Sequence, residues 1–389
     1  MTWRSRARPS GAARTSADDV GPVRVLQVFG AMNRGGAELR TFDVMRRLDR
    51  REVGLEFVAL SGQAGVLDDE IRRLGSTVHY CRLDAGFPLA FARLVRGRRA
   101  AVVHSHVFLS SAVVLAAARL GGARRRIAHF RSTTDGMPDT ARRRAYRAVM
   151  RRVMDRVATD LVGVSAGALA GGWSPRWADD PRCQVIYNGV DVDAYAASGA
   201  GASIRAELGL PADAAVAVHL ARFDPVKHHP FTAEVLAATP GLHVAFVGLG
   251  GADRERATRA RLAALGCAER AHFVGERTDV ARWLAGADVS LLPSTIEGLP
   301  GVVLESLAAG TPVIANDLSG AREIAARVPG VTIVDVARGP AAWADAVRRA
   351  LGSGPTARAA LRAALADSVF TLEHATAAHR ALWLAGATA

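Results

Sequence analysis

The chain has 389 residues, of which half are hydrophobic, and its formal net charge is +13. This length exceeds the roughly 250–300 residues that one hydrophobic core supports, so we expect two domains. Three widely spaced cysteines, Cys81, Cys183 and Cys267, argue against a disulfide framework or a structural zinc site and fit a reducing cytoplasm.

The net positive charge comes entirely from the first half of the chain. Residues 1–195 carry 32 arginines and 19 acidic residues, whereas residues 196–389 carry 18 basic and 18 acidic residues. This asymmetry indicates an anionic partner of the first half, which can be a phosphorylated substrate, a lipid surface or a nucleic acid. A solvated arginine-rich face is the alternative interpretation.

The first 22 residues are polar, and no run of 18 apolar residues occurs in the sequence. We therefore expect a disordered leader at 1–22 in place of a signal peptide, and no membrane-spanning helix. The expected location is cytoplasmic, with peripheral membrane contact through the basic half as a further possibility.

Apolar runs alternate with helical patterns in both halves, which predicts parallel sheets covered by helices on both faces. The expected strands lie within 23–30, 53–60, 76–83, 100–106, 125–131 and 160–165, and within 214–223, 242–250, 270–275, 288–293, 311–317 and 331–336. The predicted class is α/β, with two Rossmann-like domains that face each other across a ligand cleft at the strand carboxyl ends.

The domain boundaries follow from a stretch rich in turn and small residues after the sixth strand. We expect an N-terminal domain at 23–190, a linker at 191–203 and a C-terminal domain at 204–370. The remainder, 371–389, is expected to form a helix that returns toward the N-terminal domain.

A glycine-rich turn joins the first expected strand to a helix in "GAMNRGGAELR". Gly35 and Gly36 allow the backbone to approach a ligand, and the helix amino end offers free N–H groups to an anion. A simple tight turn is the alternative.

Lys227 is the only lysine in the chain, and it follows Arg222 by five residues after an expected strand. Arginine forks across two phosphate oxygens, whereas lysine places a compact, mobile charge. A lysine in a chain that otherwise uses arginine therefore indicates a pocket that accepts a point charge but not a planar fork. A surface lysine without function is the alternative.

Two carboxylates, Glu297 and Glu305, stand eight residues apart in "PSTIEGLPGVVLESLAAG", with Gly298 and Gly301 between them. They follow an expected strand and begin a helix, where carboxylates can bind sugar and ribose hydroxyls. Read as structure alone, Glu297 is a helix-capping acid and Glu305 an exposed helical charge.

Two histidines, His104 and His106, end an expected buried strand, and we expect His106 to enter the cleft. The Asp-x-Asp sequence at 191–193 lies in the expected linker, so we interpret it as a turn and predict no metal site.

The segments "RFDPVK" and "FVGERTDVARWLAGADVSLLPSTIEGLPGVVLESLAAGTPVIA" resemble the donor domain of retaining glycosyltransferases of family 4, which have the GT-B fold. The likeness extends from about residue 23 to 385. It implies a nucleotide-sugar donor, for which we expect a UDP-sugar, and no cofactor.

The resemblance also implies a role for each matching residue. Arg222 and Lys227 would hold the donor diphosphate, Glu297 the sugar hydroxyls and Glu305 the ribose. The remaining roles are sugar contacts by backbone amides near Leu299 and Gly301, approach of Gly35 and Gly36 to the diphosphate, His106 beside the transferred sugar, and base contacts by the main chain around Arg277. Pro300 departs from the pattern because it has no N–H to offer the sugar.

The resemblance further implies attack on the same face of the sugar, with the leaving phosphate accepting the acceptor's proton. No carboxylate pair of the kind that glycoside hydrolases need is evident in the sequence. We expect a hexose-type sugar to be transferred.

Two acceptor classes fit the amino-terminal segment "VLQVFGAMNRGGAELRTFDVMRRLD", which resembles two groups within the family. The expected acceptor is a small aminocyclitol glycoside in antibiotic biosynthesis, and the alternative is a lipid-linked glycan in exopolysaccharide or envelope assembly. A nucleotide-sugar epimerase, a sugar phosphorylase and a nucleic-acid-binding protein are remote alternatives. A phosphorylase would need a second anion site or a cofactor lysine, which a chain with one lysine cannot spare. A nucleic-acid binder would leave Lys227, Glu297 and Glu305 without a role.

Overall fold

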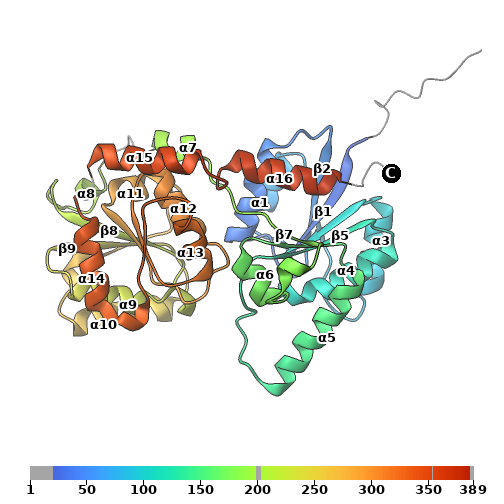
Figure 1. Ribbon diagram of the computed structural model, residues 1–389, viewed down its shortest axis with the longest axis horizontal. Helices are drawn as coiled ribbons and strands as arrows, with labels where there is room; N and C mark the ends of the chain where they lie inside the picture. Colours follow the sequence, from blue (N-terminus) through green and yellow to red (C-terminus); the bar gives the residue numbers. More distant parts are fainter. Residues whose placement is uncertain (1–20, 199–202, 353, 386–389) are drawn as a thin grey trace, which may run out of the picture.

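The computed structural model describes residues 21–198, 203–352 and 354–385. These residues form two α/β domains, each built on one parallel sheet (Figure 1). The predicted leader lies outside the described residues except for residues 21 and 22. None of the described helices is long and apolar enough to cross a membrane.

The N-terminal domain has a seven-stranded sheet in the order β3-β2-β1-β4-β5-β6-β7. Its strands are β1 (Val23–Phe29), β2 (Val53–Ala59), β3 (Val78–Tyr80), β4 (Val102–Ser105), β5 (Arg125–Phe130), β6 (Asp160–Gly163) and β7 (Cys183–Val185). Its helices are α1 (Gly36–Arg47), α2 (Asp68–Arg73), α3 (Phe87–Gly97), α4 (Ser111–Gly121), α5 (Ala141–Val157) and α6 (Ala166–Gly172), with the 3-10 turns η2 (Phe108–Ser110) and η3 (Trp177–Asp179).

The order of this sheet reverses direction at β1, so its crossover helices fall on opposite faces. One apolar core lies under α1 and α2 and includes Phe42 and Ile71. The other lies under α3, α4, α5 and α6 and includes Phe91, Leu115 and Met154. The reversal point lies between β1 and β4, where α/β sheets bind ligands.

The C-terminal domain has a six-stranded sheet in the order β10-β9-β8-β11-β12-β13. Its strands are β8 (Ala215–Leu220), β9 (Leu242–Val247), β10 (Ala271–Gly275), β11 (Val289–Leu292), β12 (Val313–Ala315) and β13 (Val331–Ile333). Its helices are α8 (Ile204–Glu207), α9 (His229–Ala237), α10 (Ala252–Ala264), α11 (Val280–Gly286), α12 (Gly301–Ala308), α13 (Ser319–Ala325), α14 (Gly339–Ala350) and α15 (Pro355–Ala366), with the 3-10 turns η4 (Pro225–Lys227), η5 (Ala268–Arg270) and η6 (Val336–Arg338). The order reverses again between β8 and β11.

The chain crosses between the domains twice, and the two crossings lie side by side. Val190 accepts a hydrogen bond from the Leu372 backbone N–H and donates one to the Phe370 carbonyl, both at 3.0 Å. After the second crossing, α16 (Leu372–Leu384) packs against α1 of the N-terminal domain (Figure 1).

The linker predicted over 191–203 begins with a helix, α7 (Val192–Ser198), and residues 199–202 lie outside the described residues. The Asp191 side chain accepts from the Ala194 backbone N–H at 3.1 Å, which caps this helix, and it pairs with Arg47 at 2.5 Å. The interpretation of residues 191–193 as a turn was therefore wrong, because Asp191 initiates a helix that packs on α11 and α12.

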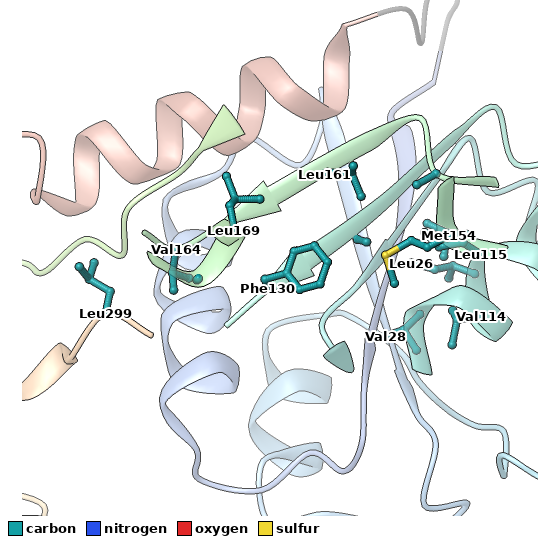
Figure 2. Packing of buried hydrophobic residues seen from close by; sticks show 14 of the residues in the cluster. Leu26, Val28, Val114, Leu115, Phe130, Met154, Leu161, Val164, Leu169 and Leu299 are labelled. Carbon is teal, nitrogen blue, oxygen red and sulfur yellow. The ribbon is translucent and has the colours of Figure 1, made fainter. Parts of the chain in front are cut away.

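Apolar packing continues from one domain into the other. Leu299, which is 5% exposed, belongs to the same buried cluster as Val164 and Leu169, and Figure 2 shows it beside Val164. Gly298 makes the close approach possible, because a Cβ there would stand 2.2 Å from the Arg131 carbonyl oxygen. This contact brings the carboxyl ends of the two sheets together.

Candidate active site

A cavity of about 310 Å³ lies between the domains, at the carboxyl ends of both sheets. Its wall combines the start of α1, residues that follow β5 and β7, and the loops after β8 and β11. The lining residues are Gly36, Ala37, Leu39, Arg40, Arg131, Asn188, Leu220, Lys227, Glu297, Gly298, Leu299, Pro300, Gly301, Val302 and Glu305.

Lys227 contacts Glu297 in this cavity. Its Nζ donates to Glu297 Oε1 at 2.6 Å, and the two side chains are only 23% and 15% exposed. Lys227 ends the 3-10 turn η4, two residues before α9 begins at His229. An ammonium group has three donors, so two remain available to an anion after the bond to Glu297.

Glu305 lies one turn into α12 and contacts the opposite domain. Its Oε1 accepts from the Arg40 guanidinium, which belongs to α1. Arg40 also donates to the Gly189 carbonyl at 3.2 Å and pairs with Asp43 at 3.2 Å. Burial and the nearby Glu305 carboxylate raise the pKa of the Tyr195 hydroxyl beside this pair.

The carboxylate of Glu38 occupies the amino end of α1. A Cβ at Gly35, the N-cap, would stand 2.3 Å from Glu38 Oε2, so this side chain folds back over the helix start. Burial raises the pKa of Glu38, and its own backbone N–H, Arg131 and Arg222 oppose that rise. An anion therefore already lies where α1 offers free N–H groups, which marks the position as anion-binding.

His106 is buried and neutral. Its Nε2 lies 2.8 Å from Gln27 Oε1, and its Nδ1 accepts from Arg131 Nε at 3.1 Å. These partners fix the tautomer that carries the proton on Nε2. Burial lowers the pKa of His106 well below the usual range, and His104 and Arg131 lower it further.

Arg131 follows β5 and donates only to neutral groups. Its partners are His106, Asn188 Oδ1 at 2.9 Å and Thr41 Oγ1 at 3.2 Å. Burial lowers its pKa, and the nearby Glu38 opposes the shift. A guanidinium that keeps its charge without a carboxylate partner gives this side of the cavity a positive potential.

Two further cavities, of about 330 and 390 Å³, extend from His106 along α5. Both are lined by Phe108, Thr134 and Asp135. Asp135 accepts from Arg143 at 2.8 Å and from Arg147 at 2.7 Å, and the bonds to these arginines lower its pKa. Arg131 lines both the cavity at His106 and the cavity between the domains, so the two adjoin.

His104, His106 and His129 form a buried group whose ring nitrogens lie within 4.8 Å of one another. His104 Nδ1 accepts from Trp383 Nε1 at 3.0 Å, and His104 Nε2 lies 3.0 Å from His129 Nδ1. Both nitrogens of His104 are therefore engaged, and Arg131 adds positive charge. The group does not fit a cation site and acts as a packed polar core.

The structure brings most of the predicted site residues together around the cavity between the domains. Those that line it are Gly36, Lys227, Glu297, Gly298, Leu299, Gly301 and Glu305. Gly35 caps α1 at its edge, and His106 lines the adjacent cavity. Arg222 is exposed on the loop after β8 and acts on Glu38 through its charge.

Arg277 lies outside the cavities described above, between β10 and α11. Its side chain pairs with Asp279 at 2.9 Å and with Glu207 at 3.3 Å, so it is held away from a ligand and only its main chain is left for the base contact that was predicted. Pro300 is the N-cap of α12 and lines the cavity between the domains without an N–H.

Sequence reasoning missed Arg40, Arg131 and Asn188. Arg131 is the last residue of an expected strand, and this position was the available signal. Asn188 follows β7 (Cys183–Val185), a strand that was not predicted from the sequence. Arg40 lies on the helix after the glycine turn, one helical turn from Gly36, and nothing in its local pattern distinguishes it from other helical arginines.

Comparison with known proteins places the chain in a family. Residues 34–194 match the model of glycosyltransferase family 4, and residues 214–353 match that of group 1 glycosyl transferases. The glycosyltransferase EpsF of Bacillus subtilis is 30% identical over 360 residues, which cover 88% of this chain and 92% of EpsF. The capsular polysaccharide biosynthesis glycosyltransferase CapH of Staphylococcus aureus is 28% identical over 309 residues, covering 78% and 83%.

Solved structures share the two-domain architecture. HepE of Anabaena, solved in complex with UDP, matches with a TM-score of 0.75 at 18% identity, covering 92% of this chain and 98% of HepE. A glycosyltransferase from Rickettsia africae matches with a TM-score of 0.76 at 16% identity, covering 94% and 98%. The expected GT-B fold is thereby confirmed. The chain belongs to glycosyltransferase family 4 and is a glycosyltransferase.

Proposed function

We propose that the enzyme transfers a hexose from a UDP-sugar to a hydroxyl of a lipid-linked glycan, with retention at the anomeric carbon, in exopolysaccharide or envelope assembly. The observation that carries this proposal is the donor cavity, where Lys227 and Glu297 of one domain face Gly36, Arg40 and Arg131 of the other.

The donor assignment follows from charge. In the proposed complex the diphosphate lies between Lys227 and the amino end of α1, where it displaces the Glu38 carboxylate. Lys227 donates to a phosphate oxygen while Glu297 holds it in place, and Glu297 is then oriented toward the sugar hydroxyls. The HepE structure, described as a complex with UDP, supports UDP as the nucleotide to test first.

The transition state carries negative charge on the leaving diphosphate and positive charge on the anomeric carbon. Lys227, Arg131 and the free N–H groups of α1 stabilise the first because they are already oriented before reaction. Both cavity carboxylates are engaged by cations, Glu297 by Lys227 and Glu305 by Arg40. Neither is set up as a nucleophile, which favours same-face attack with the phosphate as proton acceptor.

The choice between the two acceptor classes rests on the cavities along α5. Their walls include Arg131, Arg143, Arg144, Arg147 and Arg151 against only Asp135 and Asp139. Such a surface repels a polycationic aminocyclitol and attracts an anionic acceptor, for example a glycan on a lipid diphosphate. The likeness to CapH, whose name assigns it to capsular polysaccharide biosynthesis, favours the same class.

The donor proposal is tested by thermal unfolding of the purified enzyme with UDP, GDP, ADP or dTDP, without added metal. UDP at 100 times its Kd should stabilise the fold by about 2.7 kcal/mol, and EDTA should leave this shift unchanged. The shift should vanish in Lys227→Ala. A larger shift with another nucleotide would show that the sugar donor carries that nucleotide and not UDP.

The acceptor proposal is tested with radiolabelled UDP-hexoses. Incubation with a polyprenyl diphosphate glycan should move label into the organic phase, whereas a paromamine-type acceptor should stay unlabelled. Label in the aminocyclitol product and no label in the lipid would show that the acceptor is the aminocyclitol glycoside.

A further inference from the structure

The two helical layers that cover the N-terminal sheet differ in charge. The layer formed by α3, α4 and α5, here called the basic layer, contains ten arginines and a single acidic residue, Asp155. The layer formed by α1, α2 and α16, here called the balanced layer, contains six arginines and six acidic residues. The positive excess of these helices is therefore concentrated in the basic layer.

We propose that the outer face of the basic layer docks on a bilayer that contains anionic phospholipid. This inference rests on the proposed function, because a lipid-linked acceptor stays in the bilayer and the enzyme must meet it there.

The arginines on this outer face lack acidic partners. Arg93, Arg142 and Arg152 are exposed and make no side-chain hydrogen bond or ion pair within the described part of the chain. Arg119 and Arg156 are also exposed and donate only to backbone carbonyl oxygens. Unpaired guanidinium groups keep their full charge for an external anion.

One stripe of α5 shows how charge and apolar surface combine. Arg142, Ala145, Val149, Arg152 and Arg156 follow one another at the alternating three- and four-residue spacing that places side chains on one helix face. All five residues are exposed. Val149, in the centre of the stripe, is 55% exposed.

More apolar side chains lie on or beside the basic layer. Leu89 on α3 is 64% exposed, Leu120 on α4 is 62% exposed, and Met137 just before α5 is 53% exposed. This combination fits the headgroup region of a bilayer. Arginines there bind the lipid phosphates, and exposed aliphatic side chains enter the boundary of the hydrocarbon layer. A single-stranded nucleic acid would instead favour exposed aromatic rings for stacking, and no Phe, Tyr or Trp of the three helices is exposed.

The basic layer also borders the acceptor cavities. The inner side of α5 contributes Arg143 and Tyr146 to the cavity at His106, and Arg147 and Arg151 to its neighbour. When the outer side of α5 rests on lipid headgroups, an acceptor anchored in the same leaflet lies close to the mouth of these cavities. Docking and acceptor entry thus use two sides of one helix.

The test is sedimentation of the full chain with vesicles of phosphatidylcholine, with or without about 30% phosphatidylglycerol, at about 0.1 M and about 0.5 M NaCl. Wild type should sediment only with the anionic vesicles and mainly at low salt. The triple variant Arg142→Gln, Arg152→Gln, Arg156→Gln should partition roughly 100-fold less, because each arginine near a charged surface contributes to binding. Val149→Ser should weaken binding about threefold by removing buried CH₂ groups.

The matched control removes the same charge elsewhere. Arg73→Gln, Arg338→Gln, Arg349→Gln changes three exposed arginines outside the basic layer that have no side-chain partner in the described residues, and it should bind vesicles nearly as wild type does. Equal loss in both triple variants would overturn the proposal, since net charge alone would then explain binding. Tighter binding to a mixed-sequence RNA than to anionic vesicles would also overturn it.

Failure of this inference and failure of the proposed function are separable. The UDP-dependent thermal shift should be unchanged in Arg142→Gln, Arg152→Gln, Arg156→Gln, because these residues lie outside the donor cavity. An intact UDP shift in wild type with no vesicle binding would overturn only the docking surface. Vesicle binding by wild type with no UDP shift would support the surface and count against the donor proposal.

Discussion

The two halves of the cleft are built differently. In the C-terminal half, the charged residues are grouped in two short segments, and Lys227 and Glu297 pair directly with each other. In the N-terminal half, His106, Arg131 and Asn188 come from three separate strand ends, and Arg131 bonds only to neutral groups. The C-terminal half, which is the donor half of the proposed function, thus carries compensated charge. The N-terminal half, which is its acceptor half, carries buried positive charge without a carboxylate partner among the described residues.

This difference has a physical meaning. A compensated ion pair such as Lys227 with Glu297 is rigid and presents fixed donors to a ligand of constant structure. A buried guanidinium without a carboxylate raises the potential of the whole neighbouring space, which favours anionic ligands of varied shape.

The largest effect is expected from breaking the donor half. Lys227→Ala should lower kcat/KM about 10³-fold, because it removes a preorganised donor and leaves Glu297 unpaired in the cavity. Lys227→Arg should recover little of this activity, because the planar guanidinium group of arginine cannot take the place of the compact ammonium group of lysine. Steady-state kinetics with UDP-sugar measures both variants, and a retained unfolding midpoint shows that they fold. Full activity in Lys227→Ala would show that Lys227 does not bind the donor diphosphate.

A substitution in the acceptor half should reduce activity about tenfold less than Lys227→Ala does. Arg131→Met keeps the side chain's bulk but removes the charge, and we expect kcat to fall about 100-fold as one electrostatic donor is lost. The UDP thermal shift should fall only in part, because Lys227 remains. A loss as deep as that of Lys227→Ala, with no UDP binding, would show that Arg131 belongs to the donor half.

Removing Arg40, which contacts Glu305 across the two halves, should reduce activity less than either change above. Arg40→Ala removes the partner of Glu305, and we expect the KM for the donor to rise about tenfold with little change in kcat, as Glu305 loses its orientation. Glu305→Ala, by contrast, should lose most activity because the ribose contact itself is removed. A double-mutant cycle of Arg40→Ala with Glu305→Gln should show strong coupling, and additive effects would separate the two residues.

The smallest effect concerns stability and acid. Burial lowers the pKa of His104, His106 and His129, and lowers that of His379 to about 4. Below about pH 6.5 the unfolded chain takes up protons that the folded chain does not, so stability falls between pH 6.5 and 4.

Two variants of the same helix sharpen this last prediction. His379→Gln should flatten the fall of the unfolding midpoint between pH 6.5 and 4, whereas His374→Gln, at an exposed position, should leave it as in wild type. A midpoint that does not change over this range would show that these histidines are not neutral in the folded protein.

Much of the proposed donor site could be predicted from the sequence because its residues fall in two short segments. Lys227 stood out as the only lysine, and Glu297 and Glu305 flank one loop and helix start. Strand ends in a parallel sheet share one edge, so the alternation of apolar runs was sufficient to place these segments in one cleft. The expected aminocyclitol acceptor rested on composition and on one helix, and neither the arginine-lined cavities nor the likeness to the capsular polysaccharide enzyme CapH supports it.

By itself, the sequence determined the two parallel sheets and the grouping of Lys227, Glu297 and Glu305 at their carboxyl ends, because periodicity and local spacing encode strands, helices and turns. Only the tertiary structure decided that Arg40 meets Glu305, that Arg131 holds His106, and that the arginines of α5 divide between a cavity wall and an outer surface. These pairs join residues far apart in the chain, and packing across the domain boundary, which no local pattern records, sets their distances.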